Sequence, residues 1–214
     1  DDKHNAIDNS LLLQDIIISR AIYQRLSEEN PFSYISFIGA KGQPLDIEIG
    51  VPKITELGSF RPEITLFHVP SRDNMKLTAK NPIEIFLLST SESIPTLFHE
   101  PFTDTHSWIL GRKVMTLPFD GEYYLRSSHS NNKNGKMWVA IGSEERFAPE
   151  DWGSLPASIV EVRRFHESEK TIALRHTITF VSGGGNYFRL RINPSLFVQK
   201  QDQTVFKVNM ATLK

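Results

Sequence analysis

The stretch from Leu117 to Gly142, LPFDGEYYLRSSHSNNKNGKMWVAIG, indicates the fold class of this chain. Polar and apolar side chains alternate from Glu122 to Ser127, so that Tyr123 and Leu125 share one face and Tyr124 and Arg126 the other. A period of two with aromatic residues is the signature of a β-strand.

A second apolar run, from Met137 to Ile141, follows a polar segment that contains Asn134-Gly135. This dipeptide tolerates positive φ and so reverses a chain at little cost. We therefore predict that residues 117–142 form a β-hairpin. A single hairpin is not stable in water, so other strands must cover it.

Further strand patterns recur along the chain, divided by Pro, Gly and Asn turns. The clearest predicts that Leu45, Ile47, Ile49 and Val51 point inward while Asp46 and Glu48 point outward. Four more segments have strand patterns: Tyr34–Ile38, Glu63–Val69, Ile83–Leu88 and Thr105–Leu117. Aliphatic spacing leaves Ser19–Leu26 open between strand and helix. We expect the long segment Thr90–Asp104, with its two prolines, to cross from one sheet to the other.

The C-terminal part has a different character. Ser154-Leu155-Pro156 offers a helix start, with proline suited to the first turn, and helical spacing of apolar residues continues to about Glu167. Three strands are predicted after it, at Thr171–Val181, Asn186–Asn193 and Gln203–Met210.

These patterns predict an all-β protein, an antiparallel β-sandwich of jelly-roll-like topology with a short helix and additional C-terminal strands. Residues 1–15 would be a flexible leader or a first edge strand, and residues 16–147 the sandwich. Residues 148–214 would be an extension that packs on the sandwich.

Composition excludes several chemistries. The chain has 214 residues and no cysteine, so disulfides, thiolate metal sites and cysteine nucleophiles are excluded. No apolar run approaches the roughly 18 residues that span a bilayer. From Ser158 to Lys214 there are nine Lys and Arg against four Asp and Glu, although the whole chain carries a net charge of −1. This excess fits two complementary halves of one fold, or a basic surface for an acidic partner, but is too small for a dedicated nucleic-acid binder.

Several short sequence motifs resemble those of the bacterial pre-peptidase C-terminal (PPC-type) domains and their stand-alone relatives. The motifs are SRAIY starting at Ser19, YISF at Tyr34, KGQPL at Lys41, FRP at Phe60, GEYYL at Gly121 and GK at Gly135. The resemblance implies a jelly-roll sandwich of an exported protein with a role in binding, solubilising or targeting. It implies no catalytic residues. With the first residue being Asp1, we expect an extracytoplasmic protein whose signal peptide has been removed.

Candidate binding residues cluster in the segment FHEPFTDTHSW. His99, Glu100, Thr103, His106 and Trp108 form our predicted ligand-contact loop, against the simpler interpretation of a solvated crossover loop. Imidazole and carboxylate ligands also make a metal chemically possible here, but the spacing of His99 and His106 matches no compact ligand motif, so we predict no metal site and no cofactor.

Other histidines and aromatic residues have ordinary interpretations. His129 lies in the predicted hairpin loop and is expected to be solvated, whereas His68 beside Leu66 is expected to be a hydrogen-bonded core or interface residue. The aromatic residues Trp108, Tyr124, Trp138 and Trp152 could form a platform for sugar stacking, or simply pack in the core.

No nucleophile-elbow or P-loop motif is present, and we predict no catalytic residues. The sequence favours a non-catalytic exported module that binds or assembles with another protein or a glycan. One alternative is a subunit of a larger extracytoplasmic complex that docks through its C-terminal strands. A second is a metal-dependent hydrolase centred on His99 and His106. The oligomeric state is left open.

Overall fold

The structure is a computed structural model, and it describes residues 4–70, 82–129, 134–144, 146 and 151–168. The helices and strands within these residues are η1 (Ile7–Asn9), β1 (Leu11–Leu13), β2 (Arg20–Leu26), β3 (Phe32–Gly39), β4 (Pro44–Pro52), η2 (Thr55–Leu57), β5 (Pro62–Val69), β6 (Ile83–Ser89), β7 (Thr96–Glu100), β8 (Thr105–Thr116), β9 (Gly121–His129), β10 (Gly135–Ile141) and α1 (Asp151–Phe165).

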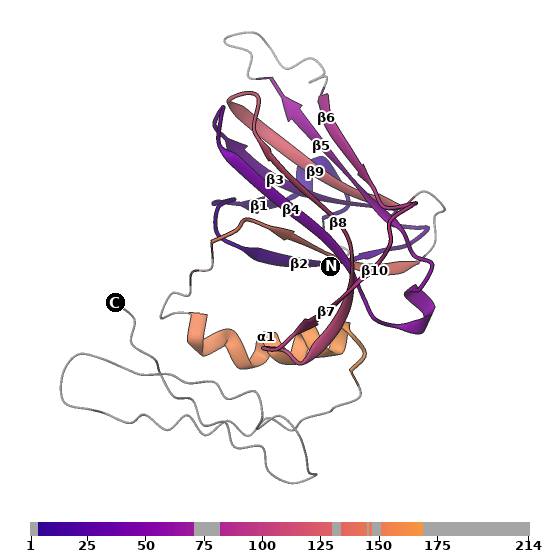
Figure 1. Ribbon diagram of the computed structural model, residues 1–214. Helices are drawn as coiled ribbons and strands as arrows, with labels where there is room; N and C mark the ends of the chain where they lie inside the picture. The colour runs from indigo at the N-terminus through magenta and orange to yellow at the C-terminus, as the bar shows by residue number, and fades with distance from the viewer. Residues whose placement is uncertain (1–3, 71–81, 130–133, 145, 147–150, 169–214) are drawn as a thin grey trace, which may run out of the picture. The chain divides into compact units, whose positions relative to one another are not determined.

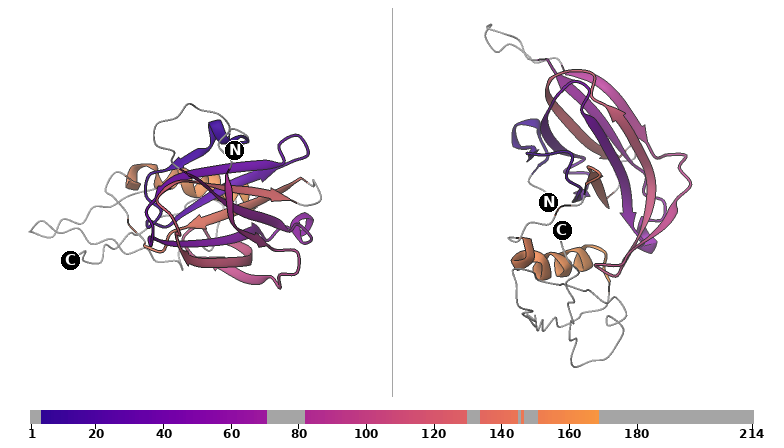
Figure 2. Two further views of the ribbon diagram at one scale, coloured as in Figure 1. Left: turned by 90° about the horizontal axis from the view of Figure 1, so that it is seen from above. Right: turned by 60° about the vertical axis from the view of Figure 1, so that its left-hand side comes forward.

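The strands form two five-stranded sheets, shown in Figure 1 and from two other directions in Figure 2. Sheet 1 has the order β1-β3-β9-β5-β6, and sheet 2 the order β2-β10-β4-β8-β7. The pairs among β2, β3, β4, β5, β6, β8, β9 and β10 are antiparallel, and β1 pairs with β3 in parallel. The predicted β-sandwich is therefore confirmed.

The strand order is that of a jelly roll with β1 and β7 added at two edges. β2 pairs with β10, β3 with β9, β4 with β8 and β5 with β6, so the chain is one long two-stranded ribbon folded back on itself. Rolling this ribbon brings β10 beside β4 and β9 beside β5, which completes the two sheets. Two Greek keys of this kind define the jelly-roll class.

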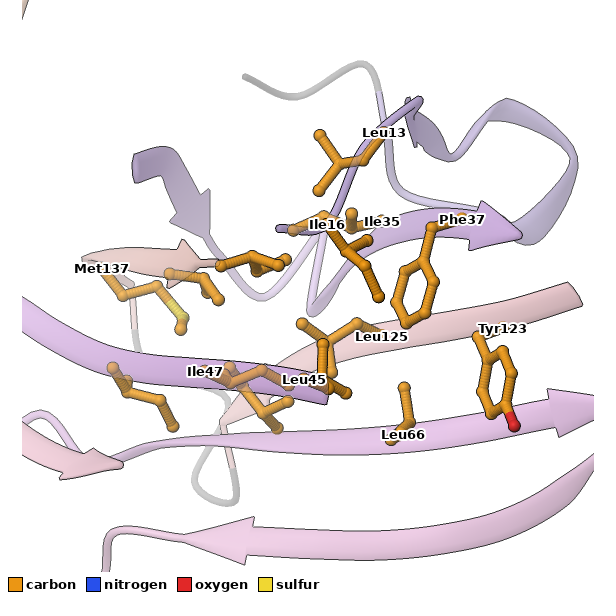
Figure 3. Close-up of a cluster of buried hydrophobic side chains, with 14 of the residues drawn as sticks. Leu13, Ile16, Ile35, Phe37, Leu45, Ile47, Leu66, Tyr123, Leu125 and Met137 are labelled. Carbon is orange, nitrogen blue, oxygen red and sulfur yellow. The ribbon is translucent and has the colours of Figure 1, made fainter. Parts of the chain in front are cut away.

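The core lies between the two sheets and consists of every second side chain of the central strands. Leu45, Ile47, Ile49 and Val51 are each 0% exposed, as their alternation predicts. Tyr123 and Leu125 meet them from sheet 1, together with Phe37, whose ring stacks on Tyr123 at 5.4 Å between centroids. Figure 3 shows Leu45 and Ile47 from sheet 2 and Phe37, Tyr123 and Leu125 from sheet 1 pointing into one interior. Burial of this apolar surface is the main source of stability for the fold.

The predicted hairpin of residues 117–142 is wrong. β9 and β10 lie in different sheets: β9 pairs with β3 and β5, and β10 pairs with β2 and β4. Alternation requires only that one face of each strand be buried, and two strands that face each other across the core satisfy it as well as two strands of one hairpin. Asn134 therefore does not join β9 and β10 in a hairpin, and its side chain accepts a hydrogen bond from the backbone N–H of Glu28 at 3.3 Å.

The remaining local predictions have mixed outcomes. Residues 20–26 are a strand, because β10 supplies a ladder partner for each of them. The segment Thr90–Asp104 does cross from sheet 1 to sheet 2, but five of its residues form β7, which the sequence analysis did not predict. The helix begins at Asp151, so Pro156 lies within it and not in its first turn. Buried Ile159 and Phe165 anchor the turns after the proline.

The chain divides into two compact units: Asp1–Phe98 with His106–Phe147, and His99–Thr105 with Ala148–Lys214. Within the second unit, α1 supplies the buried Arg163, whose Nε donates to the carbonyl oxygen of Thr103 at 2.6 Å. The three strands predicted after residue 170 lie outside the described residues. Within the part of the chain that the structure describes, no helix is long and apolar enough to cross a membrane.

Candidate functional site on the outer face of sheet 1

The side of sheet 1 that faces away from the core carries an unusual set of residues. Because side chains alternate along a strand, the neighbours of core residues Ile35, Leu66 and Leu125 point outward. The outward residues are Leu12, Phe32, Tyr34, Ser36, Ile38, Glu63, Thr65, Phe67, Val69, Glu84, Leu87, Ser89, Glu122, Tyr124, Arg126 and Ser128. We call this surface the arginine–aromatic face. A solvated sheet face would instead be mostly polar.

Arg126 lies at the centre of the arginine–aromatic face. Its guanidinium carbon lies 5.3 Å from the ring centroid of Phe32 and 5.0 Å from that of Phe67, so two aromatic rings contact one cation. Its Nη2 donates to the hydroxyl of Thr65 at 3.3 Å. Contacts of this kind favour the cation and hold its planar group in place.

Among the residues that the structure describes, none forms an ion pair with Arg126. Its Nε is buried without a hydrogen-bond partner among them. A partly buried guanidinium held by two rings and a hydroxyl can bind a carboxylate or another planar anion, because a charge-assisted hydrogen bond is stronger than a neutral one.

Tyr124 and Glu122 form the second polar feature of the face. The phenol of Tyr124 donates to Oε1 of Glu122 at 2.6 Å. Burial raises the pKa of Tyr124 to about 12, and the hydrogen bond to Glu122 and its negative charge add to the effect. Tyr124 is buried but is not part of the core between the sheets. At neutral pH it is a protonated donor that fixes the position of the Glu122 carboxylate.

The pKa of Tyr124 predicts a loss of stability in alkali. In the unfolded chain the phenol ionises near pH 10, but in the folded chain it keeps its proton to about pH 12. The stability that this proton supplies is fully present below pH 10 and is lost as the pH rises toward 12. An absorbance titration at 295 nm should show a phenolate signal near pH 12 that is missing from Tyr124→Phe. Titration of that signal near pH 10 in the folded protein would contradict the prediction.

Exposed apolar residues surround the polar centre. Leu12 is 62% exposed, Ile38 69%, Leu87 52% and Phe32 39%, and they lie on three strands of sheet 1. The five strands of sheet 1 contain no lysine and a single arginine, Arg126. Aromatic and arginine side chains without lysine are typical of the central part of protein interfaces.

The residues predicted from the sequence as a ligand-contact loop lie elsewhere. His99 and Glu100 end β7, and Thr103 follows them in the same unit, whereas His106 and Trp108 lie on β8 and belong to the other unit. No group of three or more His, Asp or Glu that could hold a metal ion occurs among the described residues. A ligand role for the five residues stays a prediction.

Three of those five residues hold the turn between β7 and β8. Nε2 of His99 lies 3.0 Å from Oδ1 of Asp104, and Oε1 of Glu100 accepts the N–H of Phe102 at 2.9 Å. The hydroxyls of Thr103 and Thr105 are 2.8 Å apart. Asp104 has a φ of 51°, which these contacts support. The polar groups that suggested a ligand site therefore also satisfy the local backbone.

On β8, the backbone of His106 accepts the N–H of Lys53 at 2.9 Å. Nζ of the same lysine lies 5.5 Å from the centre of the Trp108 ring.

The aromatic platform for sugar stacking is not assembled, because Tyr124 belongs to sheet 1 and Trp138 to sheet 2. Strand alternation alone places Tyr124 outward, but no signal in the sequence could bring Phe32 and Phe67 beside Arg126.

Two buried histidines complete the comparison with the sequence analysis. His68 is buried, and its Nε2 lies 3.0 Å from the carbonyl oxygen of Asp120, as a core histidine should. His129 is not solvated: it is 6% exposed, stacks on Phe60 at 4.4 Å, and its Nε2 accepts the N–H of Arg61. The residue ends β9 and does not lie in a hairpin loop, which explains the difference.

No family model and no curated protein matches the sequence. Among solved structures, the pre-peptidase C-terminal domain of a collagenase from Bacillus anthracis is 12% identical, covers 61% of this chain and 91% of its own, and gives a TM-score of 0.34. PliG of Aeromonas hydrophila, a periplasmic inhibitor of g-type lysozyme, is 13% identical, with 62% and 94% covered and a TM-score of 0.36.

A third similar structure is CorA of Methylomicrobium album BG8, a surface-associated copper-binding protein. It is 10% identical, covers 63% of this chain and 98% of its own, and gives a TM-score of 0.36. Identities and scores this low transfer no activity to this chain. The class of the protein follows from its own sheets: it is a β-sandwich protein with jelly-roll strand order.

Proposed function

We propose that the protein is a non-catalytic, extracytoplasmic binding module that holds a protein partner on the arginine–aromatic face. The observation that carries the proposal is the position of Arg126, which lies between two aromatic rings on an apolar surface and makes no ion pair among the described residues. The complementary partner would present a carboxylate to Arg126 and apolar side chains to Phe32 and Ile38.

A protein partner fits the face better than a glycan does. Sugar platforms combine flat exposed rings with several polar groups that bind hydroxyls. Here the exposed residues around Arg126 include the aliphatic Leu12, Ile38 and Leu87, which contribute only apolar area. Such area stabilises an interface when a partner excludes water from it.

The chemistry of the face supports binding in preference to catalysis. A general base must be able to take a proton near the working pH. The phenol of Tyr124 cannot, because its pKa of about 12 keeps it protonated at neutral pH. Arg126 remains a cation under all ordinary conditions.

The extracytoplasmic location of the protein is supported by the resemblance of its strand and turn motifs to those of exported PPC-type domains. Fractionation of cells that express the complete gene tests it. Recovery of the protein only from the cytoplasm would contradict this part of the proposal.

Peptide display on the purified full chain tests the binding surface. After counter-selection on Arg126→Ala, the selected peptides should combine Asp or Glu with aromatic or aliphatic residues. Isothermal titration of one synthetic peptide should give a Kd at least about tenfold higher for Arg126→Ala than for the wild type, as for a central interface residue. Arg112→Ala, on sheet 2, is the matched control and should leave the Kd unchanged.

Two outcomes would count against the proposal. Peptides that bind Arg126→Ala as tightly as the wild type would place the binding surface elsewhere. Selection that yields no peptide, together with specific retention on an immobilised glycan that Arg126→Ala abolishes, would replace the protein partner by a sugar.

A further inference from the structure

The register of sheet 1 arranges the outward residues of its three central strands in rows across the sheet. The first row is Tyr34, Arg126 and Thr65; the middle row is Ser36, Tyr124 and Phe67; the third row is Ile38, Glu122 and Val69. Arg126 and Glu122 therefore lie on opposite sides of the middle row, each two residues from Tyr124. Two residues of a strand span about 6.6 Å.

This arrangement is self-complementary under a two-fold rotation. Consider an axis that lies in the plane of the face, along the middle row and perpendicular to the strands. A rotation of 180° about it stacks β9 over β9 of a second copy in the opposite direction. Arg126 of each copy then lies over Glu122 of the other, and Tyr34 lies over Ile38. An interface of this kind is isologous, as in most homodimers.

We propose that the partner on the arginine–aromatic face is a second copy of this chain, paired through reciprocal Arg126–Glu122 contacts. The inference rests on the proposed function, because it names the protein that supplies the carboxylate. Sheets of two sandwiches packed face to face keep their strands within about 30° of one another and lie about 10 Å apart. That separation lets long side chains from the two outer faces meet.

The position of Glu122 favours a second copy over an unrelated acidic protein, because Glu63, Glu84 and Glu122 on the same face would repel an acidic surface that brings no arginine. An acidic partner needs only Arg126 on this face, whereas the face also presents a carboxylate in the mirrored position. The hydrogen bond from Tyr124 holds Glu122 there. The exposed Ile38 and the half-buried Tyr34 exchange places under the same rotation, so the apolar contacts are reciprocal as well.

Charge reversal tests the pairing on the full chain by light scattering during size exclusion and by sedimentation. The wild type should be a dimer at about 0.1 mM, where a pair with a micromolar Kd is almost fully formed. Arg126→Glu and Glu122→Arg should each be monomeric because like charges then meet. The double variant should form dimers again. Arg112→Glu on sheet 2 is the control and should remain dimeric.

A second variant guards against a folding defect, since Glu122→Arg also removes the hydrogen bond of Tyr124. Ile38→Lys changes a side chain that is 69% exposed, so it should abolish the dimer and leave the circular dichroism spectrum unchanged. Its Tm should equal that of the wild type at a concentration low enough for the wild type to be monomeric. A dimer that persists in both Arg126→Glu and Ile38→Lys would use another surface and would overturn the inference. Failure of the double variant to restore the dimer would overturn the reciprocal pairing.

The outcomes also separate this inference from the proposed function. A wild-type monomer at 0.1 mM (roughly a hundred times a micromolar Kd) that still binds acidic peptides through Arg126 would overturn the dimer and leave the binding module in place. A wild-type monomer whose Arg126→Ala variant binds every selected peptide unchanged would overturn both.

Discussion

Truncation of Leu125 to alanine is expected to lower the free energy of unfolding by about 2–5 kcal/mol. Leu125 lies on the central strand of sheet 1, is 0% exposed and belongs to the core that both sheets share. Its neighbours are held by ladders on both sides of β9, so they can close only part of the cavity left behind. Loss of apolar burial and the residual cavity both contribute to the cost.

Urea unfolding followed by circular dichroism measures this effect. Leu97→Ala is the matched control: Leu97 is also a strand leucine but is 50% exposed, so its truncation should cost less than about 0.5 kcal/mol. Equal losses for the two variants would mean that Leu125 does not lie in a packed interior, and the two-sheet arrangement would then be wrong.

Replacement of Gly50 by alanine is expected to cost about 2–4 kcal/mol, from overpacking and a lost hydrogen bond. A Cβ at Gly50 would lie 2.1 Å from Cζ2 and 2.3 Å from Cε2 of Trp138. The indole is rigid, so it must swing away as a whole. It would then lose the hydrogen bond from its Nε1 to the hydroxyl of Ser107, which is 3.0 Å long.

Gly111→Ala is the control for Gly50→Ala, because the two glycines lie on paired strands. A Cβ at Gly111 would meet Leu88 at 3.5 Å, which is ordinary contact, so this variant should keep the stability of the wild type. Tryptophan fluorescence should move to longer wavelength in Gly50→Ala only, because Trp138 is 6% exposed in the wild type. An unchanged spectrum and midpoint for Gly50→Ala would contradict the position of Trp138 over this glycine.

These two predictions differ in what the sequence could have foreseen. The burial of Leu125 follows from alternation along one strand, which needs no knowledge of the partners. The contact between Gly50 and Trp138, which are 88 positions apart in the chain, depends on the pairing of β4 with β10. The pattern of one strand does not tell which distant strand pairs with it. That pairing is set by the turns and by the burial of strand faces in the assembled fold.

The candidate site shows the same division. The sequence placed Tyr124 and Arg126 on the face of their strand opposite Tyr123 and Leu125, and the structure confirms it. It directed attention to the loop around His99 instead, because clustered polar residues are the only local sign of a ligand site. Phe32 and Phe67 reach Arg126 from strands on either side of β9, and that neighbourhood exists only in the assembled sheet.

The sequence by itself determined that this protein is a β-sandwich and which face of its alternating strands is buried. A period of two along a strand directly encodes which face must be hidden from water. Only the tertiary structure decided that β9 and β10 face each other across the core, since alternation is equally satisfied within one sheet and between two. It also decided where the arginine–aromatic face lies, because an outer surface is composed of residues that only strand register brings together.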